Sequence, residues 1–258
     1  HPNEEVSRMT GFKRLLILVA VLLLTGGTAL YAKDIQNLTP EQGLKLLTVG
    51  NERFAKSLST HPNTSMSRRL MTATNGQVPY ATVLACSDSR VPVEILFDQG
   101  IGDLFVIKVA GNVADIDEIG SAEYGVDHLG TPVLLVLGHS QCGAVTAVAK
   151  GAEVHGSIPK LVDNIIPAVE KAKKVHPNAT GDDLVNAAIE QNTWQSIEDI
   201  LTKSHAISDR AKQGKVAVVG GHYDILTGKV TILGPHPQEK ALLIYFLFLQ
   251  SLPISRRG

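Results

Sequence analysis

Apolar runs rich in valine, isoleucine and leucine alternate with stretches of helical spacing along most of the chain after residue 80. A continuous apolar run is typical of a strand buried on both faces, and apolar residues three or four apart are typical of a helix that packs on a sheet. We therefore expect strands at 80–86, 103–111, 131–139, 215–223 and 229–234, with helices at 119–130, 141–151, 157–175 and 182–211.

This alternation predicts the fold class. Buried strands separated by helices are typical of a largely parallel sheet with helices on both faces. Residues 224–229 read DILTGK, a turn too short for a crossover, so the last strand is expected to be an antiparallel edge. The prediction is an α/β fold whose central sheet has about four parallel strands and one antiparallel edge strand.

An amphipathic helix is expected ahead of the sheet, as an N-terminal arm. Thr39 suits the N-cap, Pro40 suits the first helical position, and Gln42 closes a capping box. Apolar residues then recur on one face, at Leu44, Leu47 and Phe54. Residues 61–79 are polar and are interrupted by proline and glycine, which predicts a loop or a short helix.

Residues 15–24 are all apolar, follow Lys13 and Arg14, and precede a stretch of small residues. Ten helical residues span about 15 Å, against about 30 Å for the hydrocarbon core of a bilayer. We expect a secretory signal that is cleaved near Ala29 or Ala32, with an uncleaved anchor as the alternative. The prediction is an exported protein of the bacterial periplasm.

A second apolar run, at residues 241–249, follows the last predicted strand. It is too short to span a membrane, so we expect a strand or helix buried at a subunit contact, with membrane-surface association as the alternative. The chain is thus divided into an upstream and signal segment at 1–32, a folded domain at 33–234 and a C-terminal apolar extension at 235–258. Membrane contact is expected through the two apolar segments alone.

Net charge indicates which kinds of partner the chain can bind, and the cysteines raise the question of a disulfide. The chain has 24 basic and 25 acidic residues and a net charge of −1, which gives no attraction for nucleic acid or an anionic membrane. A small ligand is therefore the expected partner. In an oxidising compartment the two cysteines, Cys86 and Cys142, would suggest one disulfide.

Their neighbours favour a metal site instead. Cys86 and His139 each stand where a predicted parallel strand ends, and ligands of open α/β sheets bind beyond the carboxyl ends of the strands. Cys142 follows His139 by three residues. Two sulfurs and one imidazole nitrogen suit tetrahedral zinc with a fourth position left open, which is the pattern of a catalytic site.

Asp88 and Arg90 follow Cys86 at alternate positions, in the motif CSDSR. A guanidinium two residues from a carboxylate can form a bidentate pair, which keeps Asp88 ionised and its oxygens away from the metal. Asp88 could then accept a hydrogen bond from a nucleophile held at the site. If Arg90 moved away, Asp88 could become the fourth metal ligand and close the site.

The motifs CSDSR (86–90) and GHSQCGA (138–144) resemble those of the β-class carbonic anhydrases, over residues 38–234. The resemblance implies zinc-dependent reversible hydration of CO2 to bicarbonate, on a homodimer or higher homo-oligomer with active sites at the interface. It assigns Asp88 and Arg90 as the catalytic pair. It also implies the zinc ligands Cys86, His139 and Cys142.

The same resemblance implies further site residues. Gln77, Phe105, Tyr124 and Gly143 match substrate-pocket positions, and Gln77 is expected to reach substrate from the partner subunit. His128 matches a proposed proton shuttle, with surface placement without function as the alternative.

Three other functions stay open at this stage. The same site could hydrolyse carbonyl sulfide or carbon disulfide, or Asp88 could close it permanently and leave a protein that binds metal or anions. A structural disulfide protein is the third.

Overall fold

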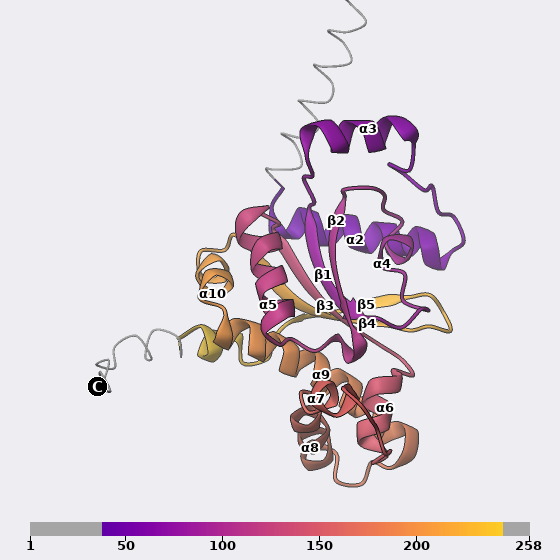
Figure 1. The fold of residues 1–258 in the computed structure, drawn as a ribbon, viewed down its shortest axis with the longest axis vertical. Coiled ribbons are helices and arrows are strands. Elements are labelled where there is room, and N and C mark those ends of the chain that lie inside the picture. The colour runs from indigo at the N-terminus through magenta and orange to yellow at the C-terminus, as the bar shows by residue number, and fades with distance from the viewer. Residues whose placement is uncertain (1–37, 245–258) are drawn as a thin grey trace, which may run out of the picture. The chain divides into compact units, whose positions relative to one another are not determined.

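The computed structural model describes residues 38–244, so the predictions for the signal segment and for residues 245–249 lie outside the described residues. A five-stranded sheet forms the centre, in the order β2-β1-β3-β4-β5 (Figure 1). The first four strands in this order pair in parallel, and β5 pairs with β4 antiparallel, which confirms the predicted fold class. The strands are β1 Ala81–Cys86, β2 Leu104–Val109, β3 Val133–His139, β4 Ala217–Tyr223 and β5 Val230–Pro235.

Helices cover both faces of this sheet. Strands β1 and β3 are buried along their whole length, which explains their continuous apolar sequences. Leu84, Leu134 and Val136 face the helices α5 (Ile116–Glu123) and α9 (Gly181–Lys203) in one core cluster. Val133 points the other way and lies against Gly43 of α2 (Pro40–Ala55), so the N-terminal arm covers the opposite face.

The predicted arm helix is confirmed with its capping box. The Thr39 backbone N–H donates to Gln42 Oε1 at 2.8 Å, and the Gln42 N–H donates to Thr39 Oγ1 at 3.3 Å. A short helix, α3 (Met66–Asn75), forms within the segment predicted as a loop or short helix. The remaining elements are α4 Val93–Leu96, η1 Ala110–Asn112, η2 Tyr124–His128, α6 Gly143–Ala149, α7 Ile158–Val162, α8 Ile166–Val175 and α10 His205–Lys212.

Two of the predicted helices are divided in the structure. The stretch 157–175 forms α7 and α8, because Pro167 lies in the first turn of the second helix. The stretch 182–211 forms α9 and α10, because Ser204 leaves helical geometry and its Oγ accepts from the Ile207 N–H at 3.2 Å. Helical spacing persists across both breaks, so periodicity alone did not reveal them.

A buried carboxylate, Asp98, ties the arm to the loop that follows it. It accepts hydrogen bonds from the Arg53 guanidinium, from the Thr60 N–H and hydroxyl, and from the His61 N–H. Burial alone would raise the pKa of Asp98, but these donors outweigh it and hold the pKa at about 2. Asp98 is therefore ionised at neutral pH and fixes this corner of the fold.

The chain continues past β5 onto the core. Residues 239–244 are helical, and Leu242 and Leu243 pack against the core cluster that α5 and α9 form with the sheet. The first part of the predicted C-terminal apolar run thus contacts its own chain. Among the helices within 38–244, none combines the length and the apolar character that crossing a membrane would need.

Candidate metal centre

Three potential metal ligands meet at the carboxyl end of the sheet. Cys86 is the last residue of β1, His139 is the last residue of β3, and Cys142 is the N-cap of α6. Because β1 and β3 are neighbours in parallel, their ends lie side by side, and α6 starts from the same edge (Figure 1). The two sulfurs and one ring nitrogen lie within 4.8 Å of one another, and all three residues are buried.

The two cysteines are free and close together. The Sγ atoms of Cys86 and Cys142 lie 4.0 Å apart, so the structure has no disulfide between them. The Cys142 thiol is the main cause that lowers the pKa of Cys86 to about 4, helped by His139 and two backbone N–H groups, while burial opposes the charge. The same contact, together with burial, raises the pKa of Cys142. A divalent cation would supply the charge that lets both sulfurs ionise.

His139 has the tautomer that a metal ligand needs. Its Nδ1 lies 2.9 Å from the Ser140 carbonyl oxygen, which can act only as an acceptor, so Nδ1 carries the proton. Its Nε2 is buried and has no hydrogen-bond partner among residues 38–244. With Zn–S bonds of about 2.3 Å, tetrahedral geometry puts two sulfurs about 3.8 Å apart, close to the 4.0 Å observed. The three residues therefore fit zinc.

Asp88 is held by Arg90, as predicted. Arg90 Nε donates to Oδ1 at 3.0 Å and Nη2 donates to Oδ2 at 2.7 Å, and the Arg90 backbone N–H adds a third bond at 2.9 Å. The Arg90 side chain is the main cause that lowers the pKa of Asp88, and it overcomes the opposing effect of burial. Arg90 Nη2 also donates to the Gln141 carbonyl at 3.2 Å, which links the pair to the loop between the two ligands His139 and Cys142.

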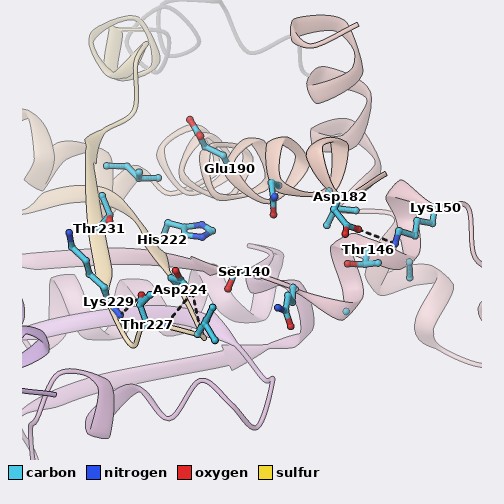
Figure 2. Close-up of a pocket in the computed structure, with 17 residues that line it drawn as sticks. Ser140, Thr146, Lys150, Asp182, Glu190, His222, Asp224, Thr227, Lys229 and Thr231 are labelled. Carbon is cyan, nitrogen blue, oxygen red and sulfur yellow. Dashed lines mark hydrogen bonds and ion pairs between the residues drawn. The ribbon is translucent and has the colours of Figure 1, made fainter. Parts of the chain in front are cut away.

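A cleft of about 1190 Å³ begins beside the ligands. Ser140, Gln141 and Gly143 line it, and its other lining residues come from α6, α9, β4, β5 and the β4–β5 turn. Figure 2 shows the His222 ring between Glu190 and Asp224, near Ser140, and burial lowers the pKa of His222. The sequence offered no signal for His222 or Gln141, since a strand histidine and a loop glutamine are common without function.

Four of the predicted site residues lie away from the cluster within the chain. Phe105 pairs with Thr82 near the start of β1, whereas Cys86 pairs with Val109, so Phe105 is four residues along the strand, or about 13 Å, from the cluster. Tyr124 lies at 5.7 Å from Phe105 between ring centroids, and His128 stacks on Tyr124 at 4.6 Å. Gln77 also precedes β1 and belongs to this end of the sheet.

Gly143 lies beside the cluster. It is the first residue of α6, next to Cys142, and its backbone N–H belongs to the helix terminus that lacks intrahelical acceptors. One chain therefore brings together Cys86, His139, Cys142 and Gly143, with the Asp88–Arg90 pair at their side.

Known proteins are similar in sequence to this chain over most of its length. The model of the carbonic anhydrase family matches residues 81–230. Carbonic anhydrase 2 of Mycobacterium tuberculosis (strain H37Rv) is 36% identical over 200 residues, which cover 76% of this chain and 94% of that protein.

Solved structures share the fold. The Coccomyxa β-carbonic anhydrase in complex with acetazolamide superposes with a TM-score of 0.62 at 25% identity, covering 78% of this chain and 95% of that one. A tetrameric β-carbonic anhydrase of the ascomycete Sordaria macrospora gives a TM-score of 0.60 at 23% identity, covering 66% and 87%. The family match, the relatives and the Cys-His-Cys cluster agree, and the chain belongs to the β-class carbonic anhydrases, zinc enzymes that reversibly hydrate CO2 to bicarbonate.

Proposed function

We propose that Cys86, His139 and Cys142 hold the zinc ion of this carbonic anhydrase, with Asp88 and Arg90 as its catalytic pair. One observation carries the proposal: two sulfurs lie close to the His139 Nε2, which has no hydrogen-bond partner among the described residues, while Arg90 donates to both oxygens of Asp88. The fourth metal position is then left for water. Zinc in such a site lowers the pKa of bound water to about 7 and supplies a nucleophile at neutral pH.

Asp88 orients that nucleophile. A carboxylate kept ionised by a guanidinium can accept a hydrogen bond and so fix the direction in which a neighbouring lone pair points. Arg90 restrains Asp88 through three hydrogen bonds, which keeps the carboxylate off the metal. The Gly143 N–H, at the start of α6, can donate to an oxygen of CO2 or bicarbonate.

Two variants test these roles. Cys86→Ser removes one ligand, so zinc content and hydration should fall together. Asp88→Asn keeps the shape but loses the charge, so it should retain about one zinc per chain and lose at least about 100-fold in kcat/KM. Near-normal turnover of Asp88→Asn would contradict the role of Asp88, and full zinc in Cys86→Ser would contradict the ligand set.

We further propose a homo-oligomer in which each site is completed by the neighbouring subunit. Phe105 and Tyr124 form an aromatic pair about 13 Å along the sheet from their own Cys86, too far to contact substrate there. The same residues on a second chain could reach the cluster across an interface, together with Gln77 and with His128, the proposed proton shuttle. The tetrameric state of the Sordaria relative agrees with this arrangement.

The surface of the arm supports a contact with a second copy. Leu46 and Val49 on α2 are 42% and 40% exposed, and Met66 and Leu70 on α3 are 66% and 58% exposed. Two consecutive helices that each expose large apolar side chains are typical of a chain segment that contacts another subunit.

Subunit complementation tests the shared site. A chain with Cys86→Ser and a chain with Phe105→Ala and Tyr124→Ala are co-expressed with different tags. In a random mixture of dimers, about one quarter of all sites combine an intact cluster with an intact aromatic pair, so hydration should return to about a quarter of the wild-type value. Co-expression of Cys86→Ser with His139→Ala is the matched control and should restore none. If the co-expressed Cys86→Ser and Phe105→Ala/Tyr124→Ala chains are no more active than either chain alone, the proposal that two subunits share each site is contradicted.

Export to the periplasm is proposed from the apolar segment at residues 15–24 and the small residues after it. Expression of the full chain in a bacterium, followed by fractionation and N-terminal sequencing, tests this. A mature periplasmic chain that starts near residue 30 or 33 is expected. A cytoplasmic chain that keeps residues 15–24 would contradict export.

A further inference from the structure

The short turn η1, which follows β2, touches the metal cluster through its backbone. The Gly111 N–H donates to Cys86 Sγ at 3.2 Å, next to the Asp88 N–H at 3.4 Å. Both Gly111 (φ 76°) and Asn112 (φ 45°) have left-handed backbone. Glycine and asparagine are the residue types that adopt this conformation most readily, and contacts from outside the turn then fix it.

Two buried polar side chains of α9 hold the turn. Asn192 Nδ2 donates to the Gly111 carbonyl at 2.6 Å, and Ser196 Oγ donates to the Asn112 carbonyl at 2.8 Å. Asn192 is 1% exposed and Ser196 is 2% exposed. The two residues are four apart, so they lie on one face of the helix and reach the same turn.

Gly111 is thus bonded on both of its peptide groups. Its N–H binds the Cys86 sulfur, and its carbonyl binds the Asn192 amide. These two groups belong to successive rigid peptide planes that meet at the Gly111 Cα, so one bond on each plane restrains φ and ψ of Gly111 and with them the direction of its N–H. Among residues 38–244, Asn192 makes no hydrogen bond to the three cluster residues, and it is connected to Cys86 through Gly111.

We propose that Asn192 is a positioning residue of the metal centre, which keeps the Gly111 N–H on Cys86 Sγ and so strengthens metal binding. The inference rests on the proposed role of Cys86 as a zinc ligand. An N–H group that donates to a thiolate stabilises its charge and fixes its direction. Outer partners of this kind typically contribute 10- to 100-fold in metal affinity. Ser196 supports the same turn at the next carbonyl.

The test compares two buried asparagines. Asn192→Ala removes the bond to Gly111, while Asn51→Ala is the matched control. Asn51 is 3% exposed and its side chain bonds to the backbone of Leu96, Gly228 and Val230, on the arm side of the sheet. Zinc dissociation constants are measured by competition with a chromophoric chelator, and the cobalt(II)-loaded proteins are compared by absorption spectroscopy.

We expect Asn192→Ala to weaken zinc binding about 10- to 100-fold, with the control within about threefold of wild type. Loss of an N–H bond raises the energy of the sulfur lone pair, so the thiolate-to-cobalt band should move to longer wavelength in Asn192→Ala alone. Equal affinities in both variants, whether weakened or unchanged, would overturn the proposal. If Asn192→Ala does not fold, the zinc affinity of Ser196→Ala is measured instead, because Ser196 holds the next carbonyl of the same turn. A severalfold loss of zinc affinity in Ser196→Ala supports the proposal, and wild-type affinity overturns it.

Cys86→Ser, measured in the same series, separates this inference from the proposed ligand set. Full zinc affinity in Cys86→Ser would overturn both. If Cys86→Ser loses zinc while Asn192→Ala matches its control, the ligand set stands and the positioning role fails.

Discussion

Gly111 is a position where one added methyl group should affect the fold and the site together. An alanine there would need φ near 76°, which costs about 1 to 2 kcal/mol for a residue with a Cβ. Its Cβ would lie 2.7 Å from Ile165 Cδ1 and 3.2 Å from Ala144 Cβ. Ile165 is fully buried, so it has no free space to move into.

The cost can be worked from these contacts. Overpacking of a buried contact adds about 1 to 3 kcal/mol, so Gly111→Ala should lower the free energy of unfolding by about 2 to 5 kcal/mol in total. For a domain of this size that corresponds to a melting temperature lower by about 5 to 15 °C. Because the turn must shift, the Gly111 N–H should also leave Cys86 Sγ, and zinc affinity should fall.

Thermal unfolding followed by circular dichroism, at one fixed protein concentration, measures the effect. Gly120→Ala is the matched control, since the added Cβ in α5 would meet no described heavy atom within 4 Å beyond its chain neighbours and the adjacent helix backbone. That variant should be more stable by about 0.5 to 1 kcal/mol. A Gly111→Ala protein that melts with wild type and keeps its zinc affinity would refute the reasoning.

Three further outcomes are expected. Asp98→Asn should lower the free energy of unfolding by about 2 kcal/mol at pH 7, because it weakens several charge-assisted hydrogen bonds. Because the pKa of Asp98 is lowered in the fold, its ionised carboxylate adds stability above the unfolded pKa of about 3.9. The difference in free energy of unfolding between wild type and Asp98→Asn should therefore vanish as the pH falls toward about 2, which urea titrations at each pH measure. Leu70→Glu should weaken subunit assembly in analytical ultracentrifugation, while an unchanged mass would remove α3 from the interface. Chelation should abolish hydration, and one equivalent of zinc should restore it; activity that survives full zinc removal would contradict the metal site.

The metal cluster could be predicted because its geometry follows from strand order. Cys86 and His139 end two buried apolar runs, and parallel neighbours bring such ends to one edge. Cys142 is three residues further and has little freedom to lie elsewhere. The Asp88–Arg90 pair is equally local, since two residues of separation place the guanidinium within reach of the carboxylate.

The surroundings of the cluster could not be predicted in the same way. Gly111 reaches Cys86 with a backbone N–H, which every residue except proline has, so the sequence showed nothing but a glycine after a strand. Asn192 is one of several polar residues in a long helix, and its burial depends on how α9 lies on the sheet. The distance of Phe105 from the cluster follows from strand register, which hydrophobic pattern does not specify between parallel strands.

Stopped-flow measurement of CO2 hydration by the purified protein, from about pH 6.5 to 9, with zinc determined on the same sample, tests the central claim most directly. The account predicts rapid hydration with about one zinc per chain, held at Cys86, His139 and Cys142. A protein that carries one zinc per chain and hydrates no CO2 anywhere in this range would contradict it.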